Sequence, residues 1–130
     1  MGEKEILLVW ITFFLMMALT TNIGFLVSGD VWELVVAAIF NVFALVVKWK
    51  LKTDFMGRIS LAGSMVAVFH IVPAAILGLS LGLHEVINVE DVINESVYAR
   101  AAYGLTFGAL IANVVSVVLL VVETATKSRE

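Results

Sequence analysis

The sequence predicts an all-α integral membrane protein with four transmembrane helices, both termini on the cytoplasmic side (N-in/C-in), and a short amphipathic helix in the outer loop between helices three and four. Three observations predict this fold class. The 130-residue chain is 62% hydrophobic, which is more apolar surface than a soluble domain of this size can bury. Its apolar residues fall into four long runs separated by short charged stretches. Basic residues collect in the stretches at one end of the runs, and acidic residues in those at the other.

The four apolar runs define the expected spans. We expect a single domain over residues 1–130, with spans at about 6–27, 31–47, 59–83 and 101–122. A helix needs about 20 apolar residues to cross the hydrocarbon layer, with about 17 as a lower limit, so each run is long enough. Helices also satisfy their own backbone hydrogen bonds within lipid. The first run lacks a basic segment before it, so we expect a retained helix and not a removable signal.

The charge difference between the loops predicts the orientation. The loop after the second run holds Lys48, Lys50, Lys52 and Arg58 against one aspartate, whereas the loop after the third run holds four acids against one arginine. Lys and Arg beside membrane spans collect on the cytoplasmic side. We therefore expect a multi-pass membrane protein with both termini in the cytoplasm, whose basic loop contacts anionic lipid and whose loop lysines extend toward water.

The acidic loop is expected to contain a short helix. Asn88 followed by Asp91 resembles a capping box, and apolar residues from Val89 to Val97 recur at helical spacing. The segment is either a separate amphipathic helix at the outer surface or a continuous extension of the last span.

Two acids in the stretch SGDVWELVVAAIFN, Asp30 and Glu33, allow two interpretations. Their spacing is that of a capping box, with Asp30 at the N-cap and Glu33 at position N3, where negative groups also suit the helix dipole. Around the symmetry axis of a homo-oligomer, the same acids would form an outer carboxylate ring, and such rings select cations. Hard oxygen ligands suit Ca²⁺, so this second interpretation makes Asp30 and Glu33 a candidate metal site.

Polar residues inside the runs are further candidates. Asn41, His70 and Asn113 lie near the middle of the second, third and fourth runs, and Asn22 lies near the outer end of the first. Such groups are costly against lipid, so we expect them to point inward. They either join the helices by hydrogen bonds or line a polar path in which Asn22 approaches Glu33.

The third run also carries the single proline of the chain. Pro73 cannot donate a hydrogen bond to the carbonyl of Phe69, and that carbonyl lies beside His70. A kink next to a titratable ring is a way to build a gate, so His70 and Pro73 are candidate gate residues. No acid lies deep within any run, which disfavours proton-coupled transport through His70.

Glycines at four-residue spacing indicate close helix packing. The third run carries Gly78 and Gly82, and the fourth carries Gly104 and Gly108. Helices in lipid associate where small residues let the backbones approach. We expect the two pairs to meet between antiparallel helices of one subunit, with an interface between subunits as the alternative.

The segment from Thr21 to Lys48, with the pattern TNIGF…GD…WEL…N…K, resembles a group of small, uncharacterised bacterial inner-membrane proteins. Members of that group carry a longer insertion between the Gly-Asp pair and the aromatic-Glu-Leu triplet. The resemblance covers the first hairpin; it implies an inner-membrane location and no activity. Small multidrug transporters are rejected because their first-span glutamate is missing, and fluoride channels because GSMVAVFHIVPAAI lacks their polar break.

These observations order the functional hypotheses. The sequence shows no nucleophile–base pair, ligand cluster or phosphate-binding glycine loop, so we expect neither an enzyme nor a cofactor other than Ca²⁺, and no nucleic-acid partner. The leading hypothesis is a homo-oligomeric, calcium-permeable cation channel whose pathway residues are Asp30, Glu33, Asn22 and Asn41. The alternative is a non-conducting accessory or scaffold protein in which the same residues cap and join helices. A proton-coupled small transporter comes third.

Overall fold

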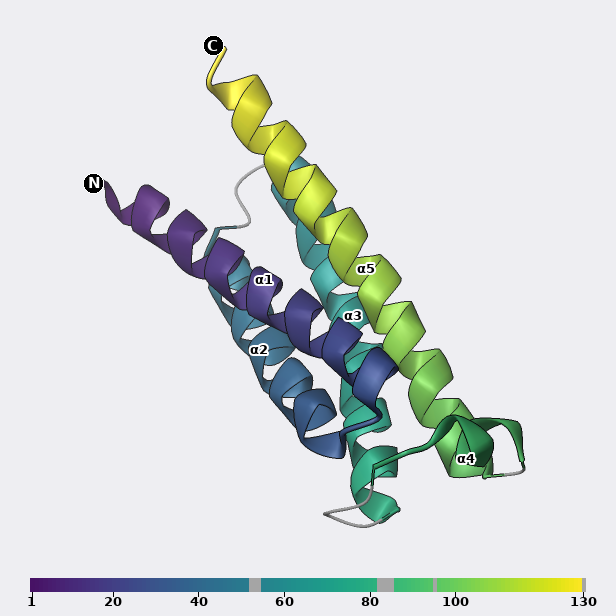
Figure 1. Cartoon of the computed structure of the whole chain (residues 1–130). Helices are drawn as coiled ribbons and strands as arrows, with labels where there is room; N and C mark the ends of the chain where they lie inside the picture. Colours follow the sequence, from purple (N-terminus) through teal and green to yellow (C-terminus); the bar gives the residue numbers. More distant parts are fainter. Residues whose placement is uncertain (52–54, 82–85, 95, 130) are drawn as a thin grey trace.

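The computed structural model describes residues 1–51, 55–81, 86–94 and 96–129, and its regular elements in those ranges are all helices. In chain order they are α1 (Glu3–Ser28), α2 (Val31–Lys50), α3 (Phe55–Ser80), α4 (Val89–Ile93) and α5 (Val97–Lys127) (Figure 1). This confirms the predicted all-helical fold. The four long helices are long and apolar enough to cross a membrane, which indicates a multi-pass membrane protein.

The four long helices form one bundle (Figure 1). α1 and α2 make an antiparallel hairpin, α3 packs against both α2 and α5, and α1 closes the bundle with a smaller contact to α5. Both chain termini lie at one end of the bundle, whereas the α1–α2 turn and α4 lie at the other. We call these the inner and the outer end, after the orientation that the loop charges predict.

Each long helix extends beyond its apolar run at one end or at both, and charged residues lie in these extensions. α1 begins at Glu3, and the Gly2 N–H donates to Glu5 Oε2 at 2.8 Å. α5 continues to Lys127, whose Nζ donates to Glu123 Oε1 at 2.6 Å, an i, i+4 ion pair that supports its last turns. α3 differs at its end, since it stops at Ser80 instead of running through residue 83.

The α1–α2 turn depends on a glycine in the left-handed conformation. Gly29 has φ 71°, and its N–H donates to the carbonyl of Phe25 at 2.7 Å, which ends α1. A residue with a side chain pays a steric penalty at this φ, so glycine is the usual choice. Asp30 follows in an extended conformation and begins α2.

The acidic loop forms the expected short helix as an element separate from α5. α4 contains five residues, and the Asn88 N–H donates to Asp91 Oδ2 at 2.9 Å. This is the carboxylate half of the predicted capping box. Val92 packs against the bundle core, whereas Val89 and Ile93 are exposed.

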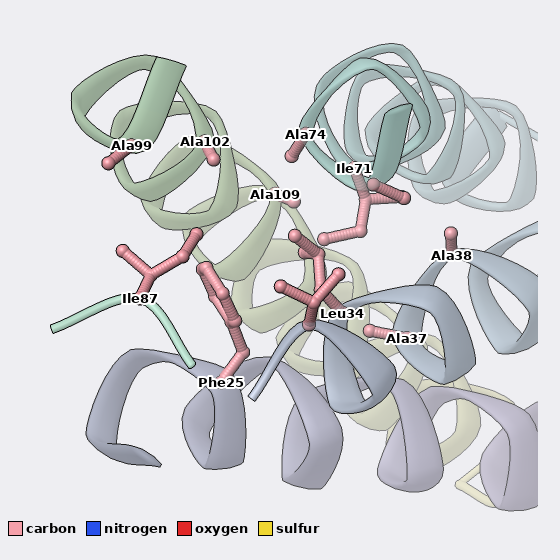
Figure 2. Packing of buried hydrophobic residues seen from close by; sticks show 12 residues of the cluster. Phe25, Leu34, Ala37, Ala38, Ile71, Ala74, Ile87, Ala99, Ala102 and Ala109 are labelled. Carbon is pink, nitrogen blue, oxygen red and sulfur yellow. The ribbon is translucent and has the colours of Figure 1, made fainter. Parts of the chain in front are cut away.

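Small residues fill the interior of the bundle. The main cluster joins Phe25, Leu34, Ile71 and Ile87 to alanines of α2, α3 and α5 (Figure 2). The ring centroids of Phe25 and Tyr103 lie 4.9 Å apart, which couples α1 to α5 near the outer end. Alanine lets helix backbones approach closely. The van der Waals contacts between closely packed helices hold them together in lipid.

The outward faces of the long helices are apolar as well. Large exposed side chains occur on all four, including Phe13, Phe43, Phe69 and Ile111. A helix that is apolar on every side suits either the core of a large protein or a lipid environment. These apolar outward faces agree with the membrane environment that the four long apolar helices suggest.

Candidate functional site

The two outer acids have local partners in the α1–α2 turn. Asp30 Oδ1 accepts a hydrogen bond from the Trp32 N–H at 2.9 Å, so Asp30 caps α2 as its spacing predicts. Glu33 Oε2 accepts from Ser28 Oγ at 3.1 Å, and the same hydroxyl accepts from the Asp30 N–H at 3.1 Å. The Glu33 carboxylate also packs over Gly24, where a Cβ would collide with it. Within one chain, both acids are therefore parts of the turn.

The segment before α4 braces this turn. The Ile87 N–H donates to the Gly29 carbonyl at 2.9 Å, and Val86 and Asp30 form an isolated antiparallel bridge. Ile87 is buried in the main core cluster (Figure 2). The loop after α3 is thereby tied to the hairpin of α1 and α2 at the outer end.

Polar side chains at mid-depth divide into two kinds. Asn41 Nδ2 donates to the carbonyl of Ala37 at 2.8 Å, and His70 Nδ1 lies 2.7 Å from the carbonyl of Val66. Both bonds stay within one helix, four residues apart. Asn22 and Asn113 are fully buried, yet their side-chain nitrogen and oxygen atoms have no hydrogen-bond partner among the described residues. The predicted approach of Asn22 to Glu33 is thus not made as a hydrogen bond.

The glycines pack against different neighbours. Gly78 of α3 faces Val31 and Leu34 of α2, and Gly108 of α5 faces the ring of His70 of α3. A Cβ at Gly104 would meet nothing within 4 Å, so this glycine lies on the outer face of α5. Gly82 lies outside the described residues. The described glycines therefore do not form the pair of facing motifs that their spacing predicts.

Pro73 lies inside α3, which continues unbroken from Phe55 to Ser80. The neighbouring His70 ring is half-buried between α3 and α5. The His70 ring is hydrogen-bonded to the Val66 carbonyl, one helical turn before it. The ring and Pro73 therefore lie in the same segment of α3, and no contact between them is described.

A buried polar cluster at the inner end joins three helices. Lys48 of α2 is only 5% exposed, and its Nζ donates to Ser64 Oγ at 2.8 Å and to Ser60 Oγ at 2.9 Å. Ser116 Oγ of α5 donates to the Ser60 carbonyl at 3.2 Å. We call these four residues the lysine cluster. The ammonium group also donates to the Ser60 carbonyl at 3.3 Å, so its hydrogen-bond acceptors among the described residues are three neutral oxygens.

The lysine cluster opens into a pocket of about 160 Å³ at the inner end. Its polar wall includes Lys4, Lys48, Lys127 and Glu123, and its apolar wall includes Leu8, Ile11, Leu51 and Leu120. Glu123 is paired with Lys127 at 2.6 Å. The described lining residues include three lysines and one glutamate, which make the inner pocket a cationic site with an apolar wall.

Sequence reasoning missed the role of Lys48. It grouped Lys48 with the loop lysines that extend toward water, and the structure corrects this, because Lys48 points into the bundle. The signal was its register: Lys48 follows Asn41 by seven residues and so continues the inward stripe of α2. Ser60 and Ser64, four residues apart on α3, supply the matching acceptors.

The described residues hold no group of three or more His, Cys, Asp or Glu side chains that could bind a metal ion. Asp30 and Glu33 of a single chain would need ligands from elsewhere to complete a Ca²⁺ site, because Ca²⁺ takes six to eight oxygen ligands. The inner pocket, in contrast, takes three lysines and one glutamate from a single chain among its described lining residues.

Comparison of the sequence with known proteins assigns the chain to a family. No curated protein and no solved structure matches the chain. A family of unknown function matches residues 28–124, which include α2, α3, α4 and most of α5. This agrees with the expectation of an uncharacterised family. The chain belongs to that family, DUF6394.

Proposed function

We propose that the protein is a multi-pass protein of the bacterial inner membrane, with both termini in the cytoplasm, and that it acts as a non-conducting accessory protein that binds an anionic group in its inner pocket. The charge pattern supports the orientation, since the inner end carries the basic loop and the outer end the acidic one. The charges of the pocket would then face the cytoplasmic leaflet.

One observation carries this proposal: Lys48 is buried in the pocket wall with neutral hydrogen-bond acceptors. Glu123 lines the same pocket and attracts this ammonium group, but its carboxylate is also paired with Lys127 at 2.6 Å. A buried cation that shares its acid in this way is costly, and a further anion recovers much of that free energy. Ionisable residues in membrane helices mark binding sites or pathways for this reason. A phosphate or carboxylate in the pocket would lie beside Lys4, Lys48 and Lys127, which all line it.

The volume of the pocket fits a small anion. A water molecule takes up about 30 Å³ of liquid, so about 160 Å³ leaves room for a phosphoryl group together with a few waters. Three lysines against one glutamate among the described lining residues disfavour a cation there.

Phosphate binding by the purified protein in a neutral detergent tests the proposal. Broadening of the ³¹P NMR line of inorganic phosphate would report binding in wild type, in Lys48→Met and in Lys50→Met. Lys50 is exposed on the same helix and does not line the pocket, so it is the matched control. We expect Lys48→Met to remove most of the broadening and Lys50→Met to keep it. Equal broadening in all three proteins would reject the pocket as the site.

The homo-oligomeric cation channel is the second candidate. The buried amides of Asn22 and Asn113, which have no hydrogen-bond partner among the described residues, favour it. Buried amides without partners are costly, and water or ions in a polar path would satisfy them. In this candidate Asp30 and Glu33 form the outer Ca²⁺-selective ring, and His70 with Pro73 forms the gate.

Ion flux into liposomes separates the two candidates. Flux of Ca²⁺, K⁺ and Na⁺ would be compared for wild type, Asp30→Asn and Glu33→Gln. Calcium flux that falls in both variants supports the channel. Absence of flux from a protein that binds phosphate supports the accessory protein, and proton-driven export that depends on His70 would favour the transporter instead.

A further inference from the structure

An apolar groove leads away from the inner pocket between α1 and α5. Three adjoining cavities share Leu120 and Thr124, and the first and third also share Leu8. We call the second and third cavities the α1/α5 groove; its further lining residues include Val9, Phe13, Leu15 and Met16 of α1 and Val117 and Val121 of α5. Pocket and groove are therefore one continuous depression with a cationic end and an apolar length.

The groove exists because α1 and α5 make a smaller contact with each other than α1 makes with α2. Phe25 and Tyr103 hold the two helices together near the outer end, and the helices separate toward the chain termini (Figure 1). Ile11 and Leu15 form the small inner core cluster at its base, with Val117 and Leu120 packed against them. The walls of the groove are thus apolar at the depth where lipid chains would surround the protein.

We propose that pocket and groove together bind one anionic phospholipid of the cytoplasmic leaflet. This rests on the proposed function and names its ligand. The phosphate would lie in the inner pocket against Lys4 and Lys48, and an acyl chain would fill the α1/α5 groove. Basic pockets between membrane helices on the cytoplasmic side are suited to acidic lipid headgroups.

The arrangement of charge and length supports a lipid over a free anion. From Lys4 to Leu15, α1 rises by about 16 Å at about 1.5 Å per residue. The groove therefore runs from the headgroup level toward the middle of the membrane, in the direction that an acyl chain takes. A free phosphate would use the lysines and leave this apolar surface without an occupant.

Native mass spectrometry of the detergent-purified protein tests this inference. The protein would be equilibrated with phosphatidylglycerol or with phosphatidylcholine of the same acyl chains. We expect a one-to-one adduct with phosphatidylglycerol that forms at least about tenfold more readily than the phosphatidylcholine adduct. One lysine near a membrane surface contributes about 1 kcal/mol of attraction, so Lys4→Gln should weaken the adduct about fivefold. Lys48→Met should weaken it further, and Lys50→Met should leave it unchanged.

The groove has its own pair of variants. Leu120→Trp places a large ring where the cavities meet, whereas Val118→Trp places the same ring on the exposed face of α5. We expect Leu120→Trp to reduce phosphatidylglycerol binding about tenfold or more and Val118→Trp to keep it. Circular dichroism would show that both variants retain their helical content.

Glycerol 3-phosphate separates this inference from the proposed function. If it binds the wild type in a Lys48-dependent manner and phosphatidylglycerol binds no more tightly, the lipid inference is overturned while anion binding in the pocket stands. If neither compound binds, both proposals fail. A dimer that forms in place of the lipid adduct and is broken by Leu120→Trp would assign the groove to a second copy and overturn the lipid inference.

Discussion

Single residues decide the shape of the outer turn. Gly29 ends α1 at φ 71°, and the carbonyl of Ile87 occupies the place where its Cβ would be. The Gly29 carbonyl in turn accepts a hydrogen bond from the Ile87 N–H at 2.9 Å. The missing side chain therefore serves two purposes: it permits the left-handed backbone and admits the segment that ties α3 to the hairpin.

Replacing Gly29 with alanine should destabilise the protein. The left-handed conformation costs a residue with a Cβ about 1–2 kcal/mol, and Ile87 must also move away. The free energy of unfolding, measured by denaturing-detergent titration, should fall by at least that amount. Gly104→Ala is the control, because its Cβ meets nothing within 4 Å and alanine favours a helix; it should be neutral or stabilising. Equal stability of Gly29→Ala and wild type would contradict the role of the turn.

The unpartnered amides permit a second prediction for single residues. Asn113 has no hydrogen bond among the described residues, whereas Asn41 donates to Ala37 at 2.8 Å. An unsatisfied buried polar group costs about 1–3 kcal/mol, so Asn113→Leu should stabilise the fold. Asn41→Leu removes a made bond and should be less favourable than Asn113→Leu. A loss of stability in Asn113→Leu, measured by the same titration, would mean that the amide has a partner such as an internal water.

At the scale of the helices, sequence patterns predict the positions and caps of helices, which depend on residues close in the sequence. They miss contacts between helices, which depend on residues far apart in the sequence. The apolar runs locate the four long helices, and the Asp30 cap and the Asn88–Asp91 box locate two helix starts. Each of these signals lies within a few residues. The lysine cluster instead joins α2, α3 and α5, so its existence depends on which helices become neighbours.

The same reasoning explains the glycines. Gly78 and Gly108 read alike in the sequence, but the first faces α2 and the second faces His70 of α3. Spacing identifies a face that permits close approach and does not identify the helix that approaches it. Helix order in the bundle, set by loop lengths and by the whole pattern of contacts, supplies that information.

The contact between α2 and α3 can be tested at Gly78. A Cβ there would lie 3.1 Å from Leu34 Cδ2 and 3.2 Å from Val31 Cγ1. Gly78→Ile adds three further carbons to this space, and overpacking of this kind costs about 1–3 kcal/mol. We expect the free energy of unfolding to fall by that amount, while Gly104→Ile on the open face of α5 changes it less. A stability of Gly78→Ile equal to that of Gly104→Ile would show that α2 and α3 are not packed as described.

For the whole molecule, the two ends differ in charge and in construction. The outer end is tied together by backbone and carboxylate contacts around the α1–α2 turn. The inner end holds the cationic pocket, where α1 and α5 separate. Anionic lipid headgroups and the positive-inside rule both concern the cytoplasmic face. The binding proposals therefore require that the inner end face the cytoplasm.

Cysteine accessibility measures this orientation directly, because the chain has no cysteine of its own. Asn94→Cys would place a thiol beside α4 at the outer end, and Ser128→Cys would place one at the inner end; both positions are exposed. With the protein expressed in a bacterial host, a membrane-impermeant maleimide added to spheroplasts should label Asn94→Cys at once. It should label Ser128→Cys only after the membrane is permeabilised. The reverse pattern, or equal labelling of both sites in intact spheroplasts, would place the lysine pocket on the wrong side for a cytoplasmic-leaflet lipid.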